Sequence, residues 1–197
     1  MLHEFTIEGN AFRLRPLVKS DSNFVVALRT ASINREFINS TSSSIVGQHR
    51  WFEDYSFRTG DYYFIIERKD SREAEGSVAL YDAKPDSAEW GRWILQRSST
   101  AAIESALLLY RFAFDILEIS EIYCRTVENN SQVISFHESC GLKRTSGFHL
   151  EVMVNGYRQH LIEHRLSTDQ WPLVKTTLTR LSNRLSRHLH SPSLDTQ

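Results

Sequence analysis

The chain has 197 residues, of which 41% are hydrophobic and 24% charged, a composition typical of one globular domain with a short tail. Its formal net charge of −1 creates no overall positive potential that would attract nucleic acid or an anionic membrane surface, so we expect neither as a partner. The chain has only two cysteines, Cys124 and Cys140, and we see neither a leader-like N-terminus nor an apolar stretch long enough to span a bilayer. We therefore expect a soluble protein of the reducing cytoplasm.

The first third of the chain predicts one strand and two helices. Residues 12–15 alternate apolar and basic side chains and stop at Pro16, as a strand does. Ser20 or Asp21 can cap a helix through Phe24 and Leu28, and a second helix is predicted over residues 47–58.

The remainder predicts a strand meander followed by a helical crossover. We expect strands at 62–67, 76–81 and 88–95, a helix at 101–117, a strand at 121–127, a helix at 131–139 ended by Gly141, and a hairpin of 150–154 with 158–165 around Asn155-Gly156. This order predicts an α/β domain with a mixed sheet and helices on both faces.

Three local sequences and this element order resemble the GNAT N-acetyltransferases. The sequences are FRLRPLVKSD from Phe12, ENNSQVISFHESCGLKR from Glu128, and VNGYRQHLIEHRLSTDQW, which ends at Trp171. The resemblance implies a GNAT fold, a mostly antiparallel sheet flanked by helices and splayed between the fourth strand (88–95) and the fifth (121–127). It divides the chain into an acetyltransferase domain, 1–168, and a C-terminal helical extension and tail, 169–197.

The turn after the fourth strand is similar to the family's pyrophosphate loop, Arg/Gln-x-x-Gly-x-Gly/Ala. Here it comprises Gln96, Arg97, Ser98, Ser99, Thr100 and Ala101, running into Ala102, so a serine replaces the middle glycine. Backbone N–H groups at a helix N-terminus would hold the phosphates of acetyl-CoA, and Ser99 would fit if its φ is negative. The alternative is a polar strand-to-helix turn in which serine and threonine only cap the helix.

The fourth strand would carry the chemistry. If its side chains alternate, Glu89, Gly91, Trp93 and Leu95 share one face. By resemblance, the backbone of Trp93, Ile94 and Leu95 pairs with the pantetheine arm, and Gly91 leaves room near the acetyl group. Glu89 is the predicted general base, unless it is only a surface carboxylate; Glu53 and His49 are alternatives on the second helix.

The 128–144 segment supplies two further predicted site residues. Asn130 matches the family asparagine that hydrogen-bonds pantetheine. His137 stands where the family commonly has a tyrosine that protonates the departing thiolate, or else it only packs. Cys140 is expected to be a buried apolar residue. His160 and His164 would lie roughly 13 Å apart on a strand, too far to share an ion, so we predict no metal site.

Beyond residue 168, Val174, Leu178, Leu181 and Leu185 form an apolar stripe at helical spacing. The helix could pack on its own domain, form a homodimer through the stripe, or present its basic residues to an acidic partner or membrane surface.

The resemblance implies an enzyme that moves acetyl from acetyl-CoA to a primary amine by direct attack. We expect a small-molecule acceptor such as a nucleotide-linked amino sugar. A protein N-terminus of the ribosomal-protein type is the alternative acceptor, and a non-catalytic acyl-CoA-binding module is the alternative function.

Overall fold

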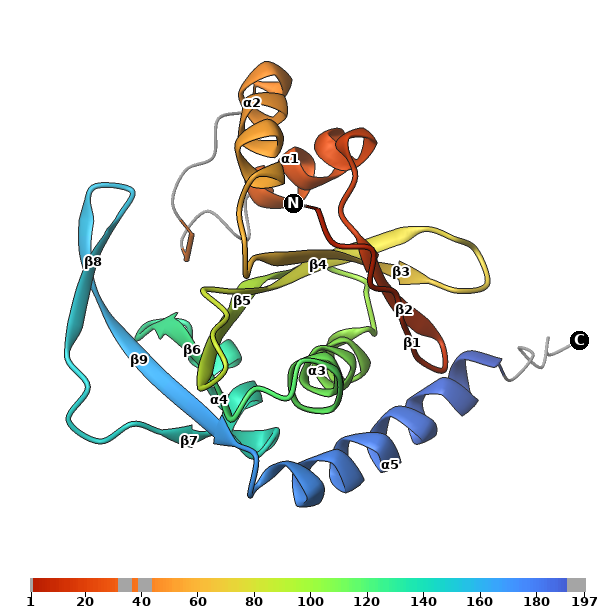
Figure 1. Ribbon diagram of the computed structural model, residues 1–197, viewed down its shortest axis with the longest axis vertical. Coiled ribbons are helices and arrows are strands. Elements are labelled where there is room, and N and C mark those ends of the chain that lie inside the picture. Colours follow the sequence, from red (N-terminus) through yellow and green to blue (C-terminus); the bar gives the residue numbers. More distant parts are fainter. Residues whose placement is uncertain (1, 32–36, 39–43, 191–197) are drawn as a thin grey trace, which may run out of the picture.

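A single nine-stranded sheet organises the described part of the protein (Figure 1). The computed structural model describes residues 2–31, 37–38 and 44–190. The strands are β1 (Ile7–Glu8), β2 (Phe12–Pro16), β3 (Tyr62–Arg68), β4 (Ala74–Tyr81), β5 (Ser87–Leu95), β6 (Glu121–Val127), β7 (Lys143–Arg144), β8 (Leu150–Val154) and β9 (Tyr157–Ser167). The helices are η1 (Lys19–Asp21), α1 (Ser22–Thr30), α2 (Ile45–Ser56), α3 (Ala102–Arg111), η3 (Phe112–Ile116), α4 (Ser131–Ser139) and α5 (Trp171–His190).

The strand order is β1-β2-β3-β4-β5-β6-β9-β7, with β8 paired to β9. Of these pairings only β5 with β6 is parallel, and it covers just Ser87–Glu89 against Glu121–Tyr123. Beyond those three residues the two strands separate, while β5 stays paired to β4 and β6 to β9. The mixed, mostly antiparallel sheet and its splay between the strands counted fourth and fifth in the sequence are therefore confirmed.

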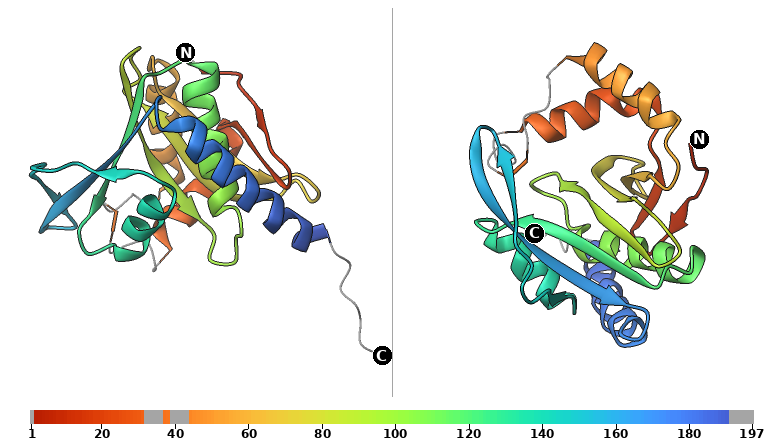
Figure 2. Two further views of the ribbon diagram at one scale, coloured as in Figure 1. Left: turned by 90° about the horizontal axis from the view of Figure 1, so that it is seen from below. Right: turned by 60° about the vertical axis from the view of Figure 1, so that its left-hand side comes forward.

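Each face of the sheet buries its own apolar cluster. Along β3, Phe64 and Ile66 face the cluster that contains α3, whereas Tyr63 and Ile65 face the cluster built on α1 and α2. Because both faces are covered, β3 is nearly all apolar instead of alternating with polar residues. Figures 1 and 2 show α1 and α2 on one side of the sheet and α3, backed by α5, on the other.

A β-bulge in β5 changes which side chains share a face. Arg92 has a φ of +47°, and the register against β4 shifts between Ser77 and Ala79. The extra residue turns Arg92 toward the α1–α2 side and brings Trp93 onto the α3 side, where its indole N–H donates to Ser105 Oγ at 3.1 Å. The strict alternation that placed Trp93 with Glu89 is therefore wrong.

Helix α3 is shorter than the sequence predicts. The 101–117 segment begins as an α-helix at Ala102 but continues from Phe112 as one π-helical turn, closed by the Leu117 N–H donating to the Phe112 carbonyl at 3.0 Å. Two short strands, β1 and β7, were not predicted, because two residues have no readable periodicity.

The C-terminal helix packs on its own chain. Trp171, Val174 and Leu178 of α5 are buried in the α3 cluster, and the Trp171 indole N–H donates to Asp115 Oδ1 at 2.7 Å. The first of the three alternatives for this helix is confirmed, and Val174 and Leu178 are not available to a second copy. Residues 191–197 of the predicted tail lie outside the described residues. Within the described part of the chain, no helix is both long and apolar enough to cross a membrane.

Candidate active site

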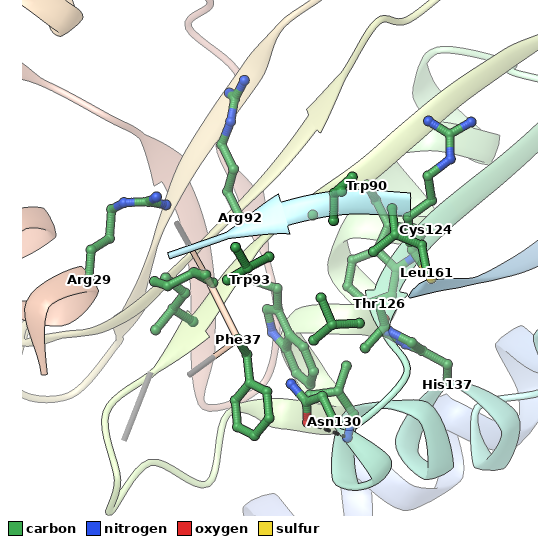
Figure 3. Close-up of a pocket in the computed structure, with 18 residues that line it drawn as sticks. Arg29, Phe37, Trp90, Arg92, Trp93, Cys124, Thr126, Asn130, His137 and Leu161 are labelled. Atoms are coloured by element: carbon green, nitrogen blue, oxygen red, sulfur yellow. Dashed lines mark hydrogen bonds between the residues drawn. The ribbon is translucent and has the colours of Figure 1, made fainter. Parts of the chain in front are cut away.

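A cavity of about 370 Å³ lies where β5 and β6 separate. Its walls come from α1, β5, β6, α4, β8 and β9, and residues Trp90 through Ile94 form the β5 side (Figure 3). Trp90 belongs to the α3 cluster, whereas Gly91 lies against Tyr81, which packs on the α1–α2 cluster. The cavity therefore reaches both faces of the sheet, so two reactants could enter from opposite sides.

Five of the residues predicted at the site line this cavity: Gly91, Trp93, Ile94, Asn130 and His137. Asn130 is also the N-cap of α4, where its Oδ1 accepts the Val133 N–H at 3.3 Å. This cap holds the Asn130 side chain at the cavity wall. A side chain held there is in a position to hydrogen-bond an extended ligand in the cavity. Leu95 lies on the same strand but is not among the described lining residues.

The β6-facing edge of β5 is open beyond Glu89. Its backbone from Gly91 to Leu95 has no strand partner on that side among the described residues. An extended chain with amide groups could pair with this edge as an added strand, which fits the predicted pantetheine contact.

The predicted phosphate loop leads from β5 into the N-terminus of α3. Ser99 is not among the non-glycine residues of the described chain that have positive φ, so the replacement of glycine causes no strain. Its hydroxyl donates to Glu75 Oε2 at 2.6 Å and accepts the Ala101 N–H at 3.2 Å, so it is not the extra phosphate donor that a serine could supply.

Several loop amides remain available. The Ser99 N–H is bonded to the Gln96 carbonyl at 3.0 Å. Within the described part of the chain, no hydrogen bond is formed by the backbone N–H groups of Arg97, Ser98, Thr100 and Ala102. Unpaired amides beside a helix N-terminus are suited to an anion such as a diphosphate.

Glu89 lies at the edge of the cavity instead of lining it. Its Oε1 accepts the Tyr81 hydroxyl at 3.0 Å, and its Oε2 accepts from Arg125 Nη1 at 3.1 Å. Arg125 is one of the residues that line the cavity, and its Nε also donates to Glu163 Oε2 at 3.1 Å. Burial raises the pKa of Glu89 above its ordinary value, against the opposing hydrogen bond from Tyr81 and the charge of Arg125. A carboxylate with a raised pKa is a suitable proton acceptor near neutral pH.

His137 is enclosed by aromatic rings. The side chain is only 3% exposed and its ring lies 4.9 Å from that of Trp90 and 5.6 Å from that of His164. Burial lowers the pKa of His137 to about 3, so the imidazole is neutral at physiological pH. A neutral imidazole argues against the predicted role as proton donor to the thiolate.

Apart from His137 and the buried thiol of Cys124, the ionisable side chains that line the cavity are cationic. They are Arg29, Arg92 and Arg125, and none of the described lining residues is Asp or Glu. Glu53, an alternative base, instead pairs with Lys19 at 3.1 Å on the surface, and neither it nor His49 is among the described residues lining the cavity. No three His, Cys, Asp or Glu side chains of the described residues converge as a metal would require.

Sequence reasoning missed Tyr81, Arg125 and the arginine at residue 29. Arg125 had a readable signal, since it is a charged residue in the otherwise apolar or neutral run from Ile122 to Val127. Tyr81 had none, because its role depends on a partner eight residues away on the next strand.

Comparisons with known proteins agree with this geometry. The family described as "Acetyltransferase (GNAT) domain" matches residues 12–143. The solved structure of apo FdhC, a nucleotide-linked sugar GNAT, has a TM-score of 0.77 and 29% identity, covering 90% of this chain and 98% of that one.

Two further structures share the fold at 18% identity. A GCN5-related N-acetyltransferase from Brucella melitensis has a TM-score of 0.79 and covers 91% of this chain and 86% of its own. The spermidine N-acetyltransferase from Vibrio cholerae, in complex with CoA and spermine, has a TM-score of 0.75 and covers 83% and 99%. A comparison with proteins of curated function gives no significant match. The open sheet, its cavity and the family match together show that the chain belongs to the GNAT acetyltransferases and is an N-acetyltransferase.

Proposed function

We propose that acetyl-CoA enters the opening between β5 and β6 as acetyl donor. The open edge of β5 would pair with the pantetheine arm, Asn130 would hydrogen-bond it, and the free amides of Arg97, Ser98, Thr100 and Ala102 would hold the pyrophosphate. The CoA complex of the Vibrio cholerae enzyme, which shares the fold, supports this choice of donor.

The acceptor amine attacks the thioester carbonyl directly. The C–N bond forms, the C–S bond breaks with its electron pair leaving on the thiolate, and the surplus proton of the nitrogen passes to Glu89, directly or through one water. The raised pKa of Glu89 supports this assignment. The backbone of β5 beside the cavity supplies N–H groups that can stabilise the developing oxyanion.

For the acceptor we propose a primary amine on an anionic carrier, namely a nucleotide-linked amino sugar. The observation that carries this choice is the cavity lining, with Arg29, Arg92 and Arg125 and no carboxylate among its described residues. Arg92 also pairs with Asp61, and Arg125 with Glu89 and Glu163, so a phosphate would bind these two guanidiniums alongside their carboxylate partners. Guanidinium groups suit phosphate oxygens, whereas a polyamine would need carboxylates. The 29% identity with a nucleotide-linked sugar GNAT over nearly its whole length supports the same class.

A panel of amine acceptors tests the proposal. We expect kcat/KM for a nucleotide-linked amino sugar to exceed that for the free amino sugar by about a hundredfold, as one or two charge-assisted hydrogen bonds provide. Arg29→Gln should reduce that ratio while leaving the free sugar unaffected. Preference for spermidine or for a peptide amine over the nucleotide-linked sugar would overturn the acceptor class.

A further inference from the structure

The Tyr81 hydroxyl is directed at the proposed base from the neighbouring strand. It donates to Glu89 Oε1 at 3.0 Å, while Arg125 donates to Oε2 at 3.1 Å. Both carboxylate oxygens are thus held, one by β4 and one by β6, at the point where β5 leaves β6. A carboxylate fixed on both oxygens still has lone pairs left to accept a proton.

The Tyr81 ring is held in place by the bulge in β5. The positive φ of Arg92 places its guanidinium over the ring, with Cζ 4.5 Å from the ring centroid. That guanidinium is in turn fixed by a two-pronged ion pair with Asp61, at 2.6 and 3.0 Å. The ring therefore has a cation on its face and little freedom to turn away.

Gly91 provides the space for the hydroxyl. A Cβ at this position would lie 2.8 Å from the Tyr81 Oη and 3.3 Å from its Cε1. Any other residue would displace the phenol from Glu89. The glycine, the bulge and the tyrosine thus form one local arrangement.

We infer that Tyr81 is a positioning residue that orients the Glu89 carboxylate for proton transfer, with Gly91 as the residue that admits its hydroxyl. This rests on the proposed role of Glu89 as base. Tyr81 acts through the carboxylate, because it is not itself among the described residues that line the cavity.

The charged and titratable groups facing Glu89 decide the sign of the effect. They are Tyr81 at the end of β4, Asp82 directly after it, Tyr123 and Arg125 from β6, and Glu163 from β9. Tyr81 and Arg125 lower the pKa of Glu89, whereas burial, Asp82 and Glu163 raise it. Burial also raises the pKa of Tyr81, so its hydroxyl stays protonated and remains a donor throughout the working pH range.

Tyr81→Phe removes the donor and keeps the ring. The carboxylate loses a hydrogen bond to its charged form, so the acidic limb of the kcat/KM profile should move up by about one pH unit. At a fixed pH below the limb, kcat/KM of Tyr81→Phe should therefore be about tenfold lower than that of the wild type. Tyr63→Phe is the matched control: its hydroxyl also lies on the α1–α2 side but contacts Ser77 at 3.4 Å, so its profile should stay that of the wild type.

Gly91→Ala provides a second variant, in which the phenol is present but displaced. It should shift the limb in the same direction as Tyr81→Phe, and the double variant should shift it no further. An acidic limb unmoved in Tyr81→Phe, or in Gly91→Ala if the first variant does not fold, would overturn the inference.

Glu89→Gln separates this inference from the base assignment. If Glu89→Gln removes the wild-type limb and leaves activity rising only at high pH, while Tyr81→Phe leaves the wild-type limb in place, only the role of Tyr81 fails. If Glu89→Gln keeps the wild-type limb, the base assignment fails, and the inference about Tyr81 fails with it.

Discussion

Two ionisable side chains at the cavity, the partly buried Glu89 and the buried His137, respond to the loss of water in opposite ways. Loss of water disfavours the charged form of each, so the pKa of Glu89 rises and the pKa of His137 falls. The Glu89 carboxylate is thereby a better proton acceptor, whereas the His137 imidazole is neutral and is not a proton donor near neutral pH.

Glu89→Gln should lower kcat/KM near neutral pH by about a hundredfold, the usual contribution of a general base. Activity should recover at high pH, where the acceptor amine is already neutral and hydroxide can take the surplus proton. A full pH–rate profile checks this, with Glu53→Gln, at a surface carboxylate that does not line the cavity, as the control. Equal losses at all pH values would show that Glu89 is only structural.

His137→Phe should make the free energy of unfolding less dependent on pH. The folded-state pKa of about 3 lies below the ordinary histidine pKa of 6.5, so the unfolded chain takes up a proton first as the pH falls from 6.5 toward 3. The wild type therefore loses up to about 1.4 kcal/mol per pH unit over that window from this group alone.

Urea denaturation of the wild type and His137→Phe at several pH values measures that difference, with the exposed His160→Gln as control. The same variant reports on catalysis. A neutral His137 predicts a kcat within about tenfold of the wild type, whereas a loss of a hundredfold or more would restore the thiolate-acid role.

Some features of the loop between β5 and α3 could be predicted from the sequence, and others could not. Its position and its helix N-terminus follow from the residue pattern. The use of the Ser99 hydroxyl does not, because its partner Glu75 comes from the adjacent strand. The bulge at Arg92 was likewise unpredictable, since no glycine marks the residue that adopts positive φ.

Thr100→Pro should weaken acetyl-CoA binding by about tenfold, because it deletes one backbone N–H that is free to bind phosphate. Thr100→Ala keeps that N–H and should bind like the wild type. Calorimetric dissociation constants for both variants provide the comparison. Equal constants would show that the pyrophosphate does not bind at this amide.

Helix α5 behaves as part of the domain. Leu178 is 1% exposed against α3, whereas Leu173 on the same helix is 76% exposed. Leu178→Ala should lower the free energy of unfolding by about 2–4 kcal/mol, and Leu173→Ala by less than about 0.5. Denaturant titration of the two variants measures both; equal small effects would mean that α5 does not pack on α3 in solution.

The described part of the molecule is built on one open nine-stranded sheet, in which β5 and β6 separate after three paired residues. The sequence predicted this separation of the two strands through its resemblance to the GNAT family, which rests on the order of all the elements and not on one motif. It could not indicate which charges surround the cavity, because Arg29, Arg92 and Arg125 come from three elements whose approach depends on the bulge and on the packing of α1.

The proposal depends above all on acetyl-CoA binding where β5 and β6 separate, and a calorimetric titration of the intact protein with acetyl-CoA tests this most directly. Repeating the titration at two temperatures avoids a temperature at which the binding enthalpy is zero. We predict saturable binding of one acetyl-CoA per chain with a negative heat-capacity change. The absence of saturable binding at both temperatures, up to millimolar ligand, would contradict it.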